Sequence, residues 1–351
     1  MNADAAHDSA LDFLAGYGHD LANGFTSHAP MVVEALASLG RPDAVRPWLD
    51  AYRPQLLPRP APRLPLAAAD WRAALGREER TADWMAFLGA ELDEAPWREV
   101  LARWLPRLAP GYCGGALHGA LRVAHAARAL SRSETPARVR ELGDALGAWA
   151  ASYQTLPAAP ARGASRRAPA DAIAAVPLQP SGERRFRGSI VSALEGLAGF
   201  ASFAPVIDWI DASAAPERAI SSLTQAFARV YLGNARDALT TIVFVHGITG
   251  AAALRSLVPH TDAAGTRELI RHAWQAGAAL YASFGSAAPD AAWPVGPLPE
   301  PATLAAAAVA HGDDHAIKLT AACLGEYAQL PDPVFLHAAR HALGALPTAH
   351  R

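Results

Sequence analysis

Lysine is almost absent from this chain of 351 residues. The sequence contains 31 lysines and arginines together, and Lys318 is the only lysine among them. A lysine amine, unlike a guanidinium, can lose its proton when it is buried, and it can then act as a base, a nucleophile or a site of carbon dioxide addition. Lys318 is therefore either a lysine without a special role on a solvated helix face or a residue whose amine has a function.

Other absences narrow the class of protein. The two cysteines, Cys113 and Cys323, lie far apart without a CxxC, which argues against a disulfide framework or a zinc ribbon and fits a reducing cytoplasm. The formal net charge is -2 with both signs interspersed, so neither nucleic acid nor an anionic membrane is an expected partner. The N-terminus lacks a basic segment followed by an apolar one, so no signal peptide is expected. The longest uncharged stretches, around 238–254 and 273–289, are interrupted by polar residues and glycine and are expected to fall short of a membrane span.

Common catalytic motifs are missing as well. The sequence has no GxGxxG dinucleotide fingerprint, no GxSxG nucleophile elbow and no HExxH zinc motif. A phosphate-binding Walker loop is excluded because Ile317, not glycine, precedes the only lysine. No repeat of 30 to 45 residues is present, which argues against a solenoid.

The hydrophobic pattern predicts helices throughout. Pro30 suits a first helical turn directly after His28, and Gly40 ends the apolar helical run that follows. The nearly all-apolar stretch 114–131 predicts a buried helix. The β-branched segment 241–245 could form a strand, but a lone strand would have no partner, so it is predicted to be helical. A further helix is expected to be capped by Asp313 or Asp314.

The predicted fold class is therefore all-α, a multi-helix globular bundle with long proline-rich loops at 53–69, 157–188 and 287–303. We expect residues 1–351 to form a single domain, in which 157–188 acts as a lid or a linker.

Histidines in apolar sequence are the main chemical signal. They are His28, His118, His125, His246 and His315, whereas His7, His19 and His350 near the termini and His260, His272, His337 and His341 in polar sequence are expected to be ordinary. Buried neutral imidazoles need hydrogen-bonding partners, and one shared cation would satisfy several of them at once.

Two of these histidines form a helical pair. His118 and His125, seven residues apart, leave one helix face about 10.5 Å apart along the axis. A metal ion between them is feasible but stretched. The alternative is that each is a core histidine bonded to a backbone carbonyl.

The only lysine shares its helix face with a histidine. His315 and Lys318 are three residues apart, one turn from the expected helix start. A cation would repel an ammonium, so a lysine beside a metal must be neutral or carbamylated, and carbamylation turns it into an oxygen ligand. His311 is a further possible ligand, although Gly312 and Asp313 place it outside this helix.

Four segments together resemble the questin oxidase family: SHAPMVVEALASLG (27–40), WREVLARWLPRLAPGYCGGALHGALRVAHAARAL (97–130), VFVHGITGAAALRSLVP (243–259) and DDHAIKLTAACLGEY (313–327). The resemblance implies an enzyme that oxidises aromatic polyketides such as anthraquinones and opens a ring by Baeyer-Villiger-type oxygen insertion or by dioxygenation. Its expected partners are a hydrophobic aromatic substrate and dioxygen.

The resemblance also implies a metal centre. In members with a recognised metal, it implies a mononuclear non-haem iron, Fe(II), held by four histidines and a carbamylated lysine. On this chain the lysine is Lys318 and the histidines are His28, His118, His125 and His246. His315 either replaces one of them or orients the lysine or a ligand.

Three alternatives stay open. Baeyer-Villiger activity in the family is associated with NADPH, for which this chain has no nucleotide motif, so any electrons would come from a separate reductase. The alternatives are an NADPH-dependent monooxygenase without metal, a zinc hydrolase that uses the same cage, and a non-catalytic helical protein that binds a hydrophobic ligand.

Overall fold

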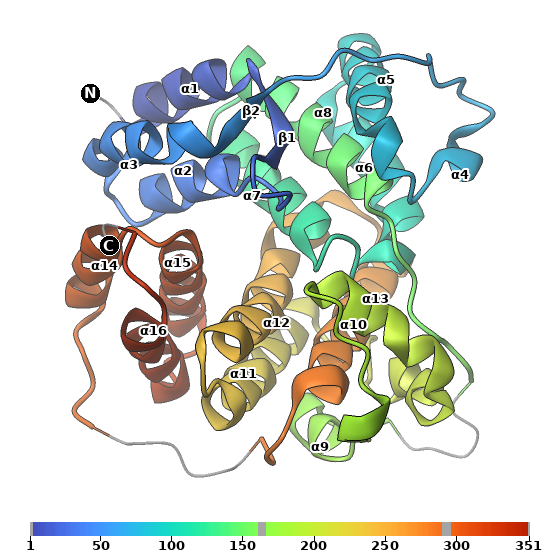
Figure 1. Ribbon diagram of the computed structural model, residues 1–351, viewed down its shortest axis with the longest axis vertical. Coiled ribbons are helices and arrows are strands. Elements are labelled where there is room, and N and C mark those ends of the chain that lie inside the picture. Colours follow the sequence, from blue (N-terminus) through green and yellow to red (C-terminus); the bar gives the residue numbers. More distant parts are fainter. Residues whose placement is uncertain (1–2, 161–165, 290–295, 350–351) are drawn as a thin grey trace.

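The computed structural model describes residues 3–160, 166–289 and 296–349, and helices dominate it (Figure 1). Its α-helices are α1 (Ala3–Leu14), α2 (Ala29–Ser38), α3 (Val45–Tyr52), α4 (Trp71–Ala74), α5 (Thr81–Glu94), α6 (Trp97–Leu108), α7 (His118–Arg132), α8 (Pro136–Ala151), α9 (Pro169–Ala174), α10 (Ile190–Glu195), α11 (Pro216–Asn234), α12 (Ala238–Leu257), α13 (Ala263–Phe284), α14 (Pro301–His311), α15 (Asp314–Gln329) and α16 (Pro333–Ala345). Short 3-10 helices are η1 (Pro42–Ala44), η2 (Arg53–Gln55), η3 (Glu78–Arg80), η4 (Ala109–Gly111), η5 (Ser181–Glu183), η6 (Gly196–Gly199), η7 (Ala201–Asp208) and η8 (Val258–His260). The all-α fold class predicted from the sequence is confirmed.

Helix α12 forms the centre of the bundle, because α7, α11, α13 and α15 all pack against it. Its start is fixed by a capping box, in which Asp237 accepts the Thr240 backbone N–H and the Thr240 hydroxyl accepts the Asp237 backbone N–H. The helical prediction for 241–245 is confirmed. Around this centre, helices from opposite ends of the chain meet, and α2 packs directly on α15 (Figure 1).

The same helix is also the most apolar one. By length and composition alone, the stretch Ala238–His260 could cross a membrane, which corrects the expectation that it falls short. The expectation ended the uncharged stretch at residue 254, whereas the helix continues through Arg255. Since 67% of its most apolar window is buried by the rest of the fold, the stretch has the burial of a core helix.

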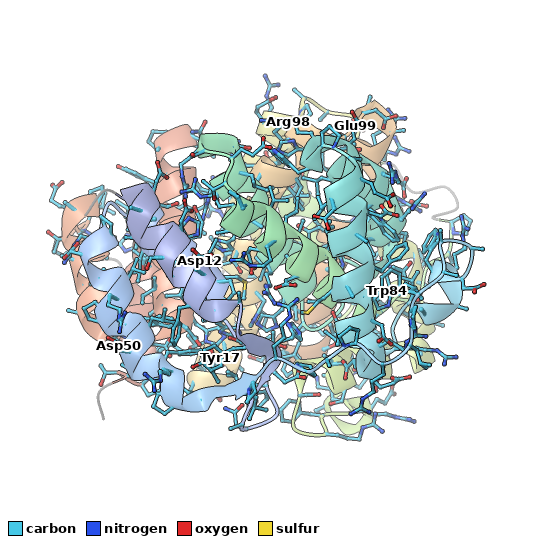
Figure 2. The ribbon with its side chains drawn as sticks, turned by 90° about the horizontal axis from the view of Figure 1, so that it is seen from above. Asp12, Tyr17, Asp50, Trp84, Arg98 and Glu99 are labelled. Atoms are coloured by element: carbon cyan, nitrogen blue, oxygen red, sulfur yellow. The ribbon has the colours of Figure 1, made fainter. Side chains whose placement is uncertain are left out.

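The core contains large aromatic side chains, and glycines let the helices that carry them approach closely. Trp84, Trp104, Trp149 and Trp274 are fully buried. A Cβ atom on Gly119 of α7 would lie 2.6 Å from the Trp149 Cα of α8, so only glycine permits this contact. Figure 2 shows that Trp84 belongs to the interior, while charged residues such as Asp50 and Arg98 lie on the outer surface.

Three helices begin in the same region. His28 directly precedes α2, and Asp313 caps α15 by accepting the backbone N–H groups of His315 and Ala316. Helix α7 begins at His118 after Gly115, Ala116 and Leu117, which all have positive φ; for Ala116 (56°) and Leu117 (71°) this conformation is strained. The strained turn directs the start of α7 toward the starts of α2 and α15.

Several local features differ from the sequence predictions. A small antiparallel sheet pairs β1 (Tyr17–Leu21) with β2 (Leu56–Pro58). Strand β2 lies in the proline-rich stretch 53–69, which was predicted to be a loop. Strands this short are fixed by tertiary contacts and leave little periodicity to detect. Residues 189–203, whose apolar residues follow a helical pattern, do not form one helix but are divided among α10, η6 and part of η7. Segment 157–188 contains α9, which packs against α11; residues 161–165 lie outside the described residues.

Candidate metal centre

Four histidine rings gather where these helices start. His28 and His118 have ring centroids 4.6 Å apart, His28 and His315 4.7 Å, His118 and His246 4.7 Å, and His246 and His315 5.4 Å. Nitrogen atoms of His28, His118 and His315 all lie within 4.8 Å of one another. The fold therefore brings together histidines from four different helices or their N-caps, which we call the histidine cage.

Two of these rings are oriented by backbone carbonyl groups. His118 Nδ1 donates a hydrogen bond to the Gly115 carbonyl (2.5 Å), and His246 Nδ1 donates one to the Ile242 carbonyl (2.7 Å). Because a carbonyl oxygen can only accept, each Nδ1 must carry the proton, and each Nε2 is left with a lone pair. Metal-binding histidines are oriented in the same way.

Asp314 orients the other two rings. Its carboxylate oxygens lie 2.9 Å from His28 Nδ1 and 2.7 Å from His315 Nδ1. Burial opposes the charge on this carboxyl, but the two neighbouring histidines hold its pKa well below the ordinary value. An ionised Asp314 at these distances favours the tautomer of each ring with its proton on Nδ1, which would leave Nε2 of both rings free to bind a metal.

The Nε2 atoms face one another at short range. His118 Nε2 lies 2.7 Å from His28 Nε2 and 3.1 Å from His246 Nε2. Burial holds the pKa of His118 and His246 well below the ordinary value and lowers the pKa of His28 to about 4, so the rings are neutral near pH 7. Lone pairs at this separation repel unless a cation lies between them. The donor set therefore fits a divalent transition metal.

Lys318 lies beside the cage. Its side chain is 4% exposed, and its Nζ has no hydrogen-bond partner in the described part of the chain. Burial lowers its pKa to about 8, although Asp314 and Asp313 oppose the shift. A charge on Lys318 would lower the pKa of His28, His118 and His246, so its protonation and that of the cage oppose each other. A buried amine without a partner, partly neutral near pH 8, suits a metal ligand formed by carbon dioxide addition.

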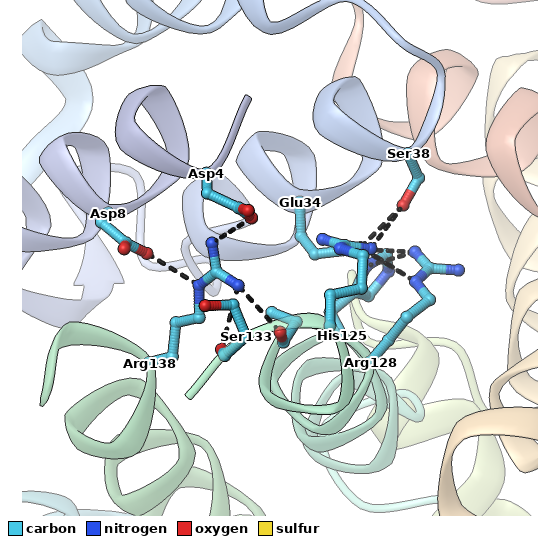
Figure 3. A network of polar contacts seen from close by, with 10 residues as sticks. Asp4, Asp8, Glu34, Ser38, His125, Arg128, Ser133 and Arg138 are labelled. Carbon is cyan, nitrogen blue, oxygen red and sulfur yellow. Dashed lines mark hydrogen bonds and ion pairs between the residues drawn. The ribbon is translucent and has the colours of Figure 1, made fainter. Parts of the chain in front are cut away.

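His125 lies apart from the four rings. Its Nδ1 is 2.7 Å from the buried carboxylate of Glu34, which also binds Arg128, Arg132 and Ser38 (Figure 3). Despite burial, Arg128 and His125 hold the pKa of Glu34 well below the ordinary value.

The placement of His125 differs from the expectation that it shares a cation with His118. The two residues lie two turns apart on α7, and His118 faces His28 and His246 while His125 faces Glu34. His125 is nevertheless close enough to Lys318 that a charge there would lower its pKa. His311 ends α14, and its Nε2 lies 3.2 Å from the Leu346 carbonyl, away from the cage.

The structure places His19, which was expected from the sequence to be an ordinary histidine, next to the site. Its carbonyl accepts the backbone N–H of Ser27 (2.8 Å), so it lies opposite the residue that precedes His28. The Asn23-Gly24 pair, a common turn signal, could have revealed this return of the chain.

The fold and the site together define an all-helical protein with a largely buried cage of four histidines and a buried lysine on the helix that carries His315. The sequence profile of the questin oxidase-like family matches residues 25–323, and this chain belongs to that family. No match was found among curated proteins.

Proposed function

We propose that this chain is a non-haem iron oxygenase that opens a ring of an anthraquinone-like aromatic substrate. Membership of the questin oxidase-like family supports an oxygenase that acts on such substrates. The observation that carries the metal proposal is the close approach of three Nε2 atoms, because His118 Nε2 lies 2.7 Å from His28 Nε2 and 3.1 Å from His246 Nε2.

The proposed ligands are Nε2 of His28, His118, His246 and His315 together with an oxygen of carbamylated Lys318. His315 thus takes the position that the sequence analysis gave to His125, because its ring contacts both His28 and His246. A bound iron with four imidazole ligands and one oxygen ligand would supply the electron-transfer chemistry that allows dioxygen to react with an aromatic ring.

The remaining groups hold the ligands in place. Asp314 fixes the orientation of His28 and His315 at once. The hydroxyl of Tyr52 accepts the backbone N–H of His28 (3.1 Å), and burial raises the pKa of this hydroxyl, so it stays protonated and anchors the start of α2. We propose that His125, backed by Glu34, acts on Lys318 through its charge environment, since a charge on Lys318 would lower the pKa of His125.

Metal analysis and oxygen uptake test the proposal. The purified protein should contain about one iron per chain and should consume dioxygen when a hydroxylated anthraquinone is added. The uptake should stop after chelation and return with Fe(II) but not with Zn(II), and assays with and without NADPH show whether a reductant is needed. A protein without a stoichiometric transition metal would contradict the proposal, and turnover under nitrogen by the zinc form would indicate a hydrolase.

A further inference from the structure

His19 is brought next to the histidine cage by a tight return of the chain. Gly24 has a positive φ of 81° at the turn, and Asp20 pairs with Thr26 across it. The carbonyl of His19 then accepts the backbone N–H of Ser27. His19 is thereby fixed to the segment that carries His28.

A buried ion pair determines which nitrogen of His19 carries the proton. Arg122, one turn after His118 on α7, binds both carboxylate oxygens of Glu141 (2.7 and 2.8 Å) and donates to His19 Nδ1 (3.4 Å). A guanidinium can only donate, so Nδ1 must accept. A neutral His19 therefore carries its proton on Nε2, the reverse of the histidines in the cage.

His19 stays neutral at working pH. Burial, together with the positive charge of Arg122 and of a protonated His28, lowers its pKa to about 3. Nε2 makes no hydrogen bond to any group in the described ranges, and the residue retains partial exposure to solvent. His19 thus presents an unused N–H donor beside the cage, which suits a neutral oxygen acceptor and not a metal ion.

We infer that His19 Nε2 donates a hydrogen bond to a carbonyl oxygen of the aromatic substrate and so selects quinones over aromatic rings that lack a carbonyl. The inference rests on the function proposed above, because it names the substrate group that this site recognises. His19 would position the ring beside the cage, and Arg122 would position His19. Selectivity of this kind follows because an unpaired donor is left when the carbonyl is missing.

Binding of two matched ligands tests the role of His19. Anthraquinone-2-sulfonate and anthracene-2-sulfonate share the three-ring skeleton and the charge but differ in the two carbonyls. Their affinities for the purified protein are measured under nitrogen by quenching of tryptophan fluorescence. The wild type should prefer the quinone about tenfold, the effect of one hydrogen bond. His19→Phe should remove this preference while the affinity for the anthracene and the iron content stay within twofold of wild type.

Two further variants complete the experiment. His19→Gln, which keeps an N–H donor, should retain part of the preference. If melting curves show that His19→Phe does not fold, His19→Ala takes its place and should lose the preference. His260→Phe, whose ring contacts Trp97, should bind both ligands as the wild type does.

The outcomes separate this inference from the proposed function. An unchanged quinone preference in folded, iron-containing His19→Phe would overturn the role of His19 and leave the oxygenase proposal intact. A wild type that binds neither ligand would overturn the inference, whereas absence of iron and of oxygen uptake would overturn the proposed function.

Discussion

The Nε2 atoms of His118 and His28 lie 2.7 Å apart, and in both rings Nδ1 lies next to an oxygen atom that can accept its proton. The Gly115 carbonyl holds the proton of His118 on Nδ1, and the Asp314 carboxylate does so for His28. Two facing lone pairs are unfavourable in a protein interior unless something positive joins them. The contacts that orient the rings therefore also bring the Nε2 lone pairs together, and a cation between them would relieve their repulsion.

The first prediction concerns which histidines bind iron. His118→Ala and His315→Ala should each retain less than about a tenth of the wild-type iron, since each removes a ligand of the proposed centre. His125→Ala should retain more iron, because its loss alters only the surroundings of Lys318. Metal analysis of the three proteins purified in parallel gives the answer. Equal iron loss in His125→Ala and wild-type iron in His315→Ala would restore the ligand set expected from the sequence.

The second prediction concerns the lysine. Lys318→Ala should lose iron while its circular dichroism spectrum stays helical, because one ligand is removed and the core is retained. Lys318→Arg should lose iron as well, since it places a permanent cation where a neutral or anionic group is required. Acetate or propionate, which can occupy the space of a missing carbamate, should partly restore iron binding to Lys318→Ala only. Normal iron in Lys318→Arg would show that this side chain is not a ligand.

The third prediction concerns acid stability. The side chain of His7 is 2% exposed, and burial lowers its pKa to about 4, so the unfolded chain with a pKa near 6.5 binds a proton first as the pH falls. The free energy of unfolding should therefore fall by about 2 kcal/mol between pH 7.5 and pH 5 through this residue alone. Urea unfolding of iron-free wild type and His7→Leu at the two pH values measures the contribution of His7 to the pH dependence of the free energy of unfolding. The same pH dependence in both proteins would contradict it.

The fourth prediction concerns the approach of α7 to α8. An alanine at Gly119 would place its Cβ 2.6 Å from the Trp149 Cα, which forces the helices apart and moves the neighbouring His118. Gly119→Ala should cost about 1–3 kcal/mol of stability and lower iron retention. Gly89→Ala is the matched control, because a Cβ there meets no atom within 4 Å, and it should gain about 0.5–1 kcal/mol. The melting temperatures of the two variants should shift in opposite directions, and only Gly119→Ala should lose iron.

Much of the helical fold could be predicted because the residues that start a helix, end it and form its apolar face lie close together in the sequence. The starts of α2 and α15, including the cap at Asp313, follow from proline and aspartate at fixed positions. The helices α1 and α14 were missed because alanine-rich sequence gives weak periodicity, and the β1–β2 sheet was missed because its pairing joins segments that carry no strand pattern.

The gathering of histidines from apolar sequence could be predicted, but not which of them meet. The rarity of lysine pointed to Lys318, and histidines in apolar sequence pointed to His28, His118 and His246. The roles of His315, His125 and His19 depend on which side chains face one another between helices, and sequence spacing within one helix does not contain that information.

The cage draws its members from positions as far apart as His28 and His315, a separation of 287 residues (315 − 28). During synthesis on the ribosome, most helices of the chain can therefore form before α15, which carries His315 and Lys318, has been made. A contact between residues so far apart in the sequence also carries a cost in loop-closure entropy, which slows the final docking step of folding. Under the proposed function, iron could be captured only after α15 has been made, and a chain truncated before α15 would lack both His315 and Lys318.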